Sequence, residues 1–181
     1  IVNLVSVGRL TWEKGYPIAL QAIRIVLDAG YKIRYDIVGG GYDLPHINFW
    51  IQKLALQDYV SVLGTLSQNR VKEILQNSDI YIQASLSESF CVAVVEAQLM
   101  GLPVICSQVG GLPEVIDCGV SGILIPCADV NSLATAIQQL VSNSSDREKM
   151  SQASRTNIEK RFSLKTEVEL WTKYYETGNV V

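Results

Sequence analysis

The sequence predicts an α/β fold, a doubly wound parallel sheet of about six strands with helices on both faces and a helical C-terminal end. Three observations carry this prediction. Short apolar runs alternate with amphipathic stretches along the chain, which is typical of parallel strand–helix–strand units. Turns rich in glycine follow most of the apolar runs, and only helical patterns occur from Asn131 onward.

Six runs have the length and composition of strands. Val2–Val7 and Ile80–Gln83 are mostly apolar and rich in residues that favour strands, as expected of interior strands covered on both faces. The predicted strands are Val2–Val7, Arg34–Val38, Val60–Leu63, Ile80–Gln83, Pro103–Cys106 and Gly122–Ile125.

The segments between these runs carry apolar residues at helical spacing. Ser163 is a predicted N-cap between the last two helices, with Glu167 near the first turn of the second. The predicted helices are Tyr16–Ala29, Leu44–Leu56, Val71–Gln76, Phe90–Met100, Leu112–Ile116, Asn131–Val141, Asp146–Arg161 and Leu164–Tyr175.

Length and composition indicate one globular domain. The chain has 181 residues, of which 48% are hydrophobic and 18% charged. Its net charge of −3 argues against a nucleic-acid partner, which requires a basic surface. No apolar run reaches the ~18 residues of a membrane span, and no signal peptide is recognisable. Because the chain starts at Ile1 and enters a strand at once, we expect it to be a piece of a longer polypeptide.

The cysteines and the histidine do not indicate a metal site. The four cysteines form no CxxC pair, and His46 is the single histidine of the sequence, so a zinc site is not expected. We expect reduced, partly buried thiols in a cytosolic domain and an ordinary surface or partly buried His46.

Ligands of open α/β sheets bind beyond the carboxyl ends of the strands, so the turns after five strands should meet at one edge. Arg9 and Lys14 in the first turn are suited to phosphate, although solvated loop cations are the alternative. Glycine in most of these turns would let the backbone approach a ligand closely. No G-x-G-x-x-G fingerprint follows a strand, which disfavours a dehydrogenase. The turns are Gly8–Gly15, Gly39–Gly41, Gly64–Leu66, Ser85–Glu88 and Ser107–Gly111.

Glu88 lies just before the helix predicted over Phe90–Met100. Ser89 is its predicted N-cap, so the first amide groups of this helix, on Phe90, Cys91 and Val92, would be free to bind an anion. Glu88 would then accept hydrogen bonds from hydroxyl groups. The alternative is an ordinary surface carboxylate.

Glu96 lies inside the same predicted helix. It would share a face with its apolar neighbours three and four positions away, which are Val92, Ala93, Leu99 and Met100. A carboxylate there is costly unless something hydrogen-bonds to it. The two glutamates therefore predict a pocket for a polar, phosphate-bearing ligand, unless Glu96 is turned to solvent.

Five motifs in this order resemble the group 1 glycosyltransferases, which are retaining, nucleotide-sugar-dependent enzymes of GT-B fold. The motifs are Gly8-Arg9-Leu10 with Glu13-Lys14-Gly15, Gly39-Gly40-Gly41, Val62-Leu63-Gly64, Glu88-x7-Glu96 and Gly110-Gly111-Leu112-Pro113-Glu114. The resemblance covers nearly the whole chain. It implies that residues 1–181 are the C-terminal, Rossmann-like domain that binds the nucleotide sugar, and that the N-terminal acceptor domain is absent from this chain.

The resemblance implies hexosyl transfer, with retention, from a nucleoside diphosphate sugar to a sugar, lipid or other acceptor held by the missing domain. This is an activity of carbohydrate biosynthesis, and the chain alone is expected to be inactive. The implied location is cytoplasmic, or peripheral at the inner face of the cytoplasmic membrane. No cofactor or metal is expected, since two cations and the helix field would neutralise the leaving diphosphate.

Residue roles also follow from the resemblance. Arg9 and Lys14 would contact the diphosphate, and Glu88 would bind the hydroxyls of the sugar. The positions implied to bind the donor are Gly8, Gly39, Gly40, the backbone of Gly64, Thr65 and Leu66 at the base, the amides of Phe90, Cys91 and Val92 at the sugar and diphosphate, and Glu96 at the ribose. Ser89 and Cys91 stand where the family often has glycine, which narrows the space beside the sugar.

Two other functions are compatible with the same architecture. A nucleotide-sugar epimerase would need acid and base side chains in the cleft, and this chain supplies only Glu88 and His46. A non-catalytic module would use the sheet edge only to bind a nucleotide or a protein.

Overall fold

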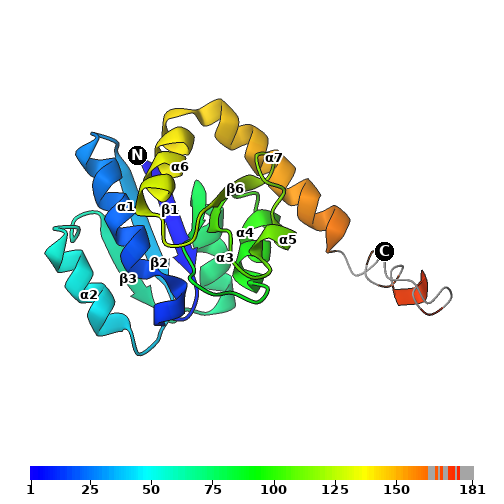
Figure 1. Cartoon of the computed structure of the whole chain (residues 1–181), viewed down its shortest axis with the longest axis horizontal. Helices are drawn as coiled ribbons and strands as arrows, with labels where there is room; N and C mark the ends of the chain where they lie inside the picture. Colours follow the sequence, from blue (N-terminus) through cyan, green and yellow to red (C-terminus); the bar gives the residue numbers. More distant parts are fainter. Residues whose placement is uncertain (163–165, 167, 169–170, 174, 176–181) are drawn as a thin grey trace.

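Six parallel strands form one sheet in the computed structural model of the chain, which describes residues 1–162, 166, 168, 171–173 and 175 (Figure 1). All neighbouring strands in it run parallel, which confirms the predicted α/β sheet. The strands are β1 (Val2–Val7), β2 (Ile33–Val38), β3 (Val60–Gly64), β4 (Ile80–Gln83), β5 (Val104–Ser107) and β6 (Gly122–Ile125).

The strand order is β3-β2-β1-β4-β5-β6. The chain builds outward from β1 to β3, then returns to the other side of β1 and builds outward from β4 to β6. β1 and β4 are therefore neighbours whose following segments turn away in opposite directions. The crevice at such a switch point, outside the carboxyl ends of the strands, is where open α/β sheets bind ligands.

Helices cover both faces of the sheet. In β4, Ile80 and Ile82 belong to one apolar cluster and Tyr81 belongs to the other, because successive strand residues point to opposite faces. Residues of α1, α2 and α6 complete the first cluster, and residues of α3, α4, α5 and the end of α7 complete the second. The helices are α1 (Tyr16–Asp28), α2 (Leu44–Lys53), α3 (Gln68–Gln76), α4 (Val92–Leu99), α5 (Leu112–Val115), α6 (Val130–Ser142) and α7 (Ser144–Arg161), with a short 3-10 helix, η1 (Trp12–Lys14).

The end of the described chain is helical, as predicted. Asn143 caps α7 by accepting a hydrogen bond from the amide of Asp146, so this helix starts two residues earlier than expected. Ser163 and much of the helix predicted over 164–175 lie outside the described residues. Within the described ranges, no helix is both long and apolar enough to cross a membrane.

The start of α4 differs from the prediction. The helix begins at Val92, and its N-cap is Cys91 in a left-handed conformation with φ of 59°, in place of the predicted Ser89. The carbonyl groups of Glu88 and Ser89 accept hydrogen bonds from the amide of Gly111, at 3.3 and 3.1 Å. This pairing holds the segment against the loop after β5, and it engages the Ser89 carbonyl, which as an N-cap would accept the first hydrogen bond of the helix.

Candidate functional site

The loops after β1, β2, β3, β4 and β5 meet at the carboxyl edge of the sheet. The amide of Leu10 donates to the carbonyl of Gly40 at 2.9 Å, and the amide of Leu86 donates to the carbonyl of Glu13 at 2.7 Å. The first bond joins the loops after β1 and β2, and the second joins the loops after β1 and β4. The structure thus brings most of the predicted site residues to one edge.

The glycines of these loops let the loops pack against one another. A Cβ on Gly110, which has φ of +51°, would lie 1.5 Å from the carbonyl oxygen of Glu88. A Cβ on Gly39 would lie 1.8 Å from the carbonyl oxygen of Gly8. The sequence analysis expects these glycines to let a ligand approach the backbone. In the structure, the atoms that leave no room for a side chain at Gly39 and Gly110 belong to neighbouring loops.

Lys14 and Glu88 form an ion pair across the switch point. Lys14 ends η1 after β1, and Glu88 lies in the loop after β4; their side chains are only 13% and 11% exposed. The ammonium group of Lys14 donates to Oε2 of Glu88. Gly15 makes this placement possible, because its left-handed backbone turns the chain into α1 and a Cβ there would lie 2.0 Å from the carbonyl oxygen of Ala84.

A row of buried polar side chains leads along β4 to this ion pair. The hydroxyl of Tyr81 lies 2.9 Å from Oε1 of Gln83, and Nε2 of Gln83 donates to Oγ of Ser85 at 2.7 Å. Ser85 Oγ in turn lies 3.4 Å from Oε2 of Glu88. The sequence reading missed this row by treating β4 as an apolar strand. The signal was present as polar groups at every second position, which places them on one face of a strand.

The thiol groups beneath Glu88 are neutral at physiological pH. Burial, together with the negative charge of Glu88, raises the pKa of Cys91 to about 11. Burial also raises the pKa of Cys106 well above its usual value. Cys118 and Cys127 are exposed, and all four cysteines are free. The predicted partial burial is thus found, with two thiols buried and two exposed.

Glu96 does not lie on an apolar stripe, contrary to the expectation. α4 buries Val94, Ala97 and Gln98, while Glu96 and Val92, one turn apart, lie on its exposed side. The helix starts later than predicted and presents the face of Val94 and Ala97 to the sheet, so the carboxylate is solvated. Glu96 therefore does not need a ligand to offset burial in an apolar environment.

Other predicted residues lie in the loops of the same edge. Arg9 is exposed in the loop after β1, and Gly8 lies beneath the aliphatic part of Lys14. Thr65 follows β3, where its hydroxyl lies next to Gly40. The same loop begins at Gly64, which has φ of +71°, and leads to the partly buried Leu66.

Phe90 connects the edge to the end of α7. Its ring is 42% exposed and packs edge-to-face on Phe162, with ring centres 5.7 Å apart. α7 is fixed to the same face of the sheet by Asn157, which donates to the carbonyl of Val115 at 3.1 Å, and by Ser154, which donates to the carbonyl of Ser121 at 2.7 Å.

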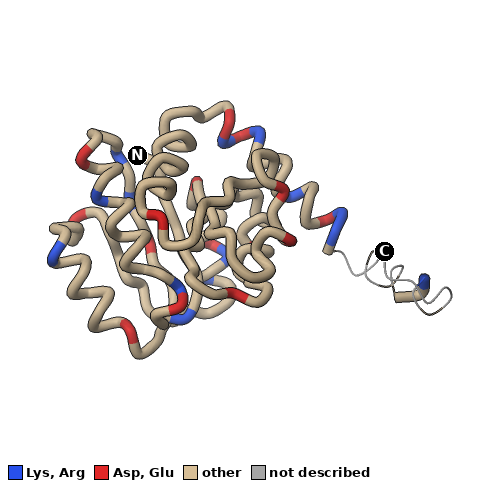
Figure 2. Tube along the Cα trace, viewed as in Figure 1, with Lys and Arg blue, Asp and Glu red and all other residues tan. Residues whose placement is uncertain are grey.

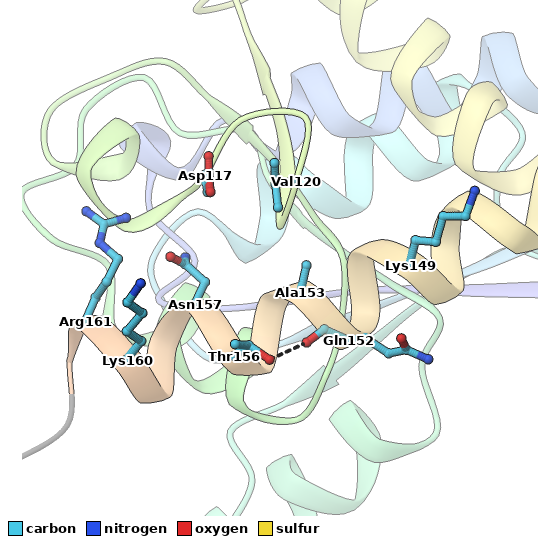
Figure 3. A pocket seen from close by; sticks show the side chains of 9 residues that line it. All are labelled: Asp117, Val120, Lys149, Gln152, Ala153, Thr156, Asn157, Lys160 and Arg161. Atoms are coloured by element: carbon cyan, nitrogen blue, oxygen red, sulfur yellow. Dashed lines mark hydrogen bonds between the residues drawn. The ribbon is translucent and has the colours of Figure 1, made fainter.

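A groove of about 550 Å³ lies between α7 and the loop before β6, and it contains none of the predicted site residues. Figure 3 shows its side chains along the helix, opposite Asp117 and Val120. Charged residues of both signs are interspersed along the described chain (Figure 2), so the cations of this groove are not part of one basic face. The lining residues are Asp117, Val120, Lys149, Gln152, Ala153, Thr156, Asn157, Lys160 and Arg161.

Known glycosyltransferases are similar to this chain in sequence. The amylovoran biosynthesis glycosyltransferase AmsK of Erwinia amylovora is 33% identical over 168 residues, which are 90% of this chain and 41% of that protein. The chain spans less than half the length of the curated relatives it matches.

Solved structures share the fold. HepE of Anabaena in complex with UDP aligns with a TM-score of 0.86 and 21% identity, over 97% of this chain and 48% of that one. The C-terminal domain of the group 1 family protein LpcC of Francisella tularensis aligns with a TM-score of 0.80 and 20% identity, over 90% of this chain and 87% of that one.

The sequence model of the glycosyl transferases group 1 matches residues 3–157, from β1 to the second half of α7. This range includes the loops that form the carboxyl edge and both members of the Lys14–Glu88 ion pair. The family resemblance read from the five motifs is confirmed, together with its Rossmann-like, GT-B type of fold. The chain therefore belongs to the group 1 glycosyltransferases.

Proposed function

We propose that this chain is the C-terminal half of a retaining glycosyltransferase and binds a nucleoside diphosphate sugar, from which the whole protein transfers a hexosyl group. The observation that carries the proposal is the largely buried Lys14–Glu88 ion pair at the switch point of the sheet. A cation and a carboxylate side by side there can bind the two polar parts of such a donor, its phosphates and its sugar hydroxyls.

The length of the edge supports an elongated ligand. Gly64 to Leu66 follow β3, which is three strands away from β4 in the sheet. Neighbouring strands are ~4.8 Å apart, so this loop and Glu88 are separated by about 14 Å. A nucleobase beside Gly64, Thr65 and Leu66, with its sugar beside Glu88, would use this length, with the diphosphate crossing β1 between them.

The residue roles follow from this orientation. Arg9 and Lys14 would contact the diphosphate; the Lys14 ammonium group has three donors, so it can serve a phosphate while it stays paired with Glu88. Backbone amides of Phe90, Cys91 and Val92 would face the sugar and diphosphate. Glu96, which is exposed near the middle of α4, would bind the ribose.

Further support comes from HepE, which has this fold and whose crystal structures are complexes with UDP and with UDP-glucose. The acceptor would bind to a second domain outside this chain, so the chain alone would bind donor without transferring sugar. We propose that the leaving diphosphate is stabilised by the two cations, with no metal.

Titration calorimetry of the chain with UDP, GDP and ADP tests the proposal. We expect one nucleotide to bind. Arg9→Met should lower the affinity for this nucleotide about tenfold or more, because a charge-assisted hydrogen bond to phosphate is lost. Arg34→Met is the matched control, because Arg34 is also exposed but lies toward the other end of β2. No binding of any of the three at millimolar concentration, by a folded chain, would contradict the proposal.

A further inference from the structure

Tyr81, Gln83 and Ser85 are an unusual set for a central parallel strand and the residues just after it. Strands covered on both faces are normally apolar, yet Gln83 is 4% exposed and Ser85 is fully buried. Buried polar groups are costly without partners. Each of these three is hydrogen-bonded to the next, and the last reaches Glu88.

The hydrogen bonds of the row point in one direction. Gln83 accepts through Oε1 on the side of Tyr81 and donates through Nε2 to Ser85. Since Gln83 supplies the proton between these two residues, the Ser85 hydroxyl directs its own proton to Glu88. Bonds aligned in this way also polarise and strengthen one another.

Two of the groups that hold the Glu88 carboxylate contact the same oxygen, because the Ser85 hydroxyl and the Lys14 ammonium group both reach Oε2. The thiol of Cys91, which burial keeps neutral, is also hydrogen-bonded to this carboxylate. A carboxylate can accept about four hydrogen bonds, two at each oxygen, so Oε1 keeps a position for a hydroxyl of a ligand.

We propose that Gln83 and Ser85 are positioning residues for Glu88, which fix its Oε2 from beneath so that Oε1 accepts a hydrogen bond from the transferred sugar. This inference rests on the proposed donor site, in which Glu88 binds the sugar hydroxyls. Gln83 does not touch the donor. It acts through Ser85, and its loss would reduce binding of the sugar without affecting the nucleotide.

A double-mutant cycle tests the network without any ligand. The unfolding equilibrium in urea is measured for wild type, Gln83→Met, Glu88→Gln and the double variant. Each variant changes the unfolding equilibrium constant by some factor. We expect the factor of the double variant to differ from the product of the two single factors by about threefold or more, because the residues share one network. Gln76→Met, at the exposed end of α3, is the control and should combine with Glu88→Gln by simple multiplication. Simple multiplication for Gln83 as well would overturn the inference.

Calorimetry separates positioning from general stability. The affinities for UDP and UDP-glucose, GDP and GDP-mannose, and ADP and ADP-glucose are compared in the folded variants. Gln83→Met and Ser85→Ala should lose about three- to tenfold in affinity for the nucleotide sugar but not for its nucleotide, and Ser85→Thr should restore it.

Two other outcomes are distinguishable. Equal losses for nucleotide and nucleotide sugar, or no loss, would overturn the positioning role and leave the donor site standing. Failure of the wild type to bind any of the six compounds would refute the donor site, and with it the sugar-directed role.

Discussion

Phe90, in the loop after β4, packs against Phe162, the residue that follows α7, with an angle of 66° between the rings. The two residues are 72 positions apart in the sequence, and their contact joins the segment before α4 to the end of the last helix described in full. The guanidinium group of Arg161 lies over the Phe162 ring and also donates to the carbonyl of Glu114. The end of α7 is thereby fixed to the loop that carries Glu88.

Phe162→Ala should lower the free energy of unfolding by about 1–2 kcal/mol, because a half-buried ring and an aromatic pair are lost. Urea denaturation followed by circular dichroism measures this. Tyr42→Ala in the loop after β2 is the control; this ring is 69% exposed, so its removal should cost clearly less. Equal effects of the two substitutions would show that the Phe90–Phe162 contact does not fix α7.

Lys14→Met should destabilise the chain by about 1–3 kcal/mol, because it leaves a largely buried carboxylate without its cation. Adding Glu88→Gln should recover part of that loss, since the uncompensated charge is removed. Lys32→Met, at an exposed position before β2, should change little. Strictly additive effects of Lys14→Met and Glu88→Gln in chemical denaturation would contradict a coupled pair.

Gly110→Ala and Gly30→Ala separate backbone strain from crowding. Both glycines have positive φ, +51° and +86°, so alanine is strained at each by about 1–2 kcal/mol. At Gly30 a Cβ meets nothing within 4 Å, whereas at Gly110 it overlaps the carbonyl of Glu88. Gly110→Ala should therefore be the more destabilising in thermal unfolding. A similar loss for both would mean that the loops after β4 and β5 can separate without cost.

Alkylation should distinguish two classes of cysteine. Iodoacetamide at pH 8 should label the exposed Cys118 and Cys127 and spare Cys91 and Cys106, because burial keeps both thiols protonated. Labelling of Cys91 should rise as the pH approaches its pKa of about 11. Peptide mass spectrometry gives the modified positions, with the urea-unfolded chain as the control for full labelling. Labelling of Cys91 as fast as that of Cys118 at pH 8 would contradict the described burial.

Sequence reasoning was most accurate where a property is local and repeated. Six strands, the parallel sheet and the edge that collects the loops all follow from alternating apolar runs and from glycine turns. It was least accurate around α4, where the start of the helix depends on bonds from Gly111, a residue about twenty positions away. The expected burial of Glu96 was also wrong. Which face of a short apolar helix is buried depends on the segments packed against it, and these are distant in the sequence.

The α/β architecture, the family and the candidate residues Arg9, Lys14 and Glu88 can be predicted from the sequence alone. Periodicity and motif order are properties of neighbouring residues in the chain, so they can be read without coordinates. Three features become visible only in the folded chain: Lys14 pairs with Glu88, Gln83 lies beneath this pair, and carbonyl groups of neighbouring loops leave no room for a side chain at the glycines. These are contacts between segments far apart in sequence, created when β4 returns to the side of β1.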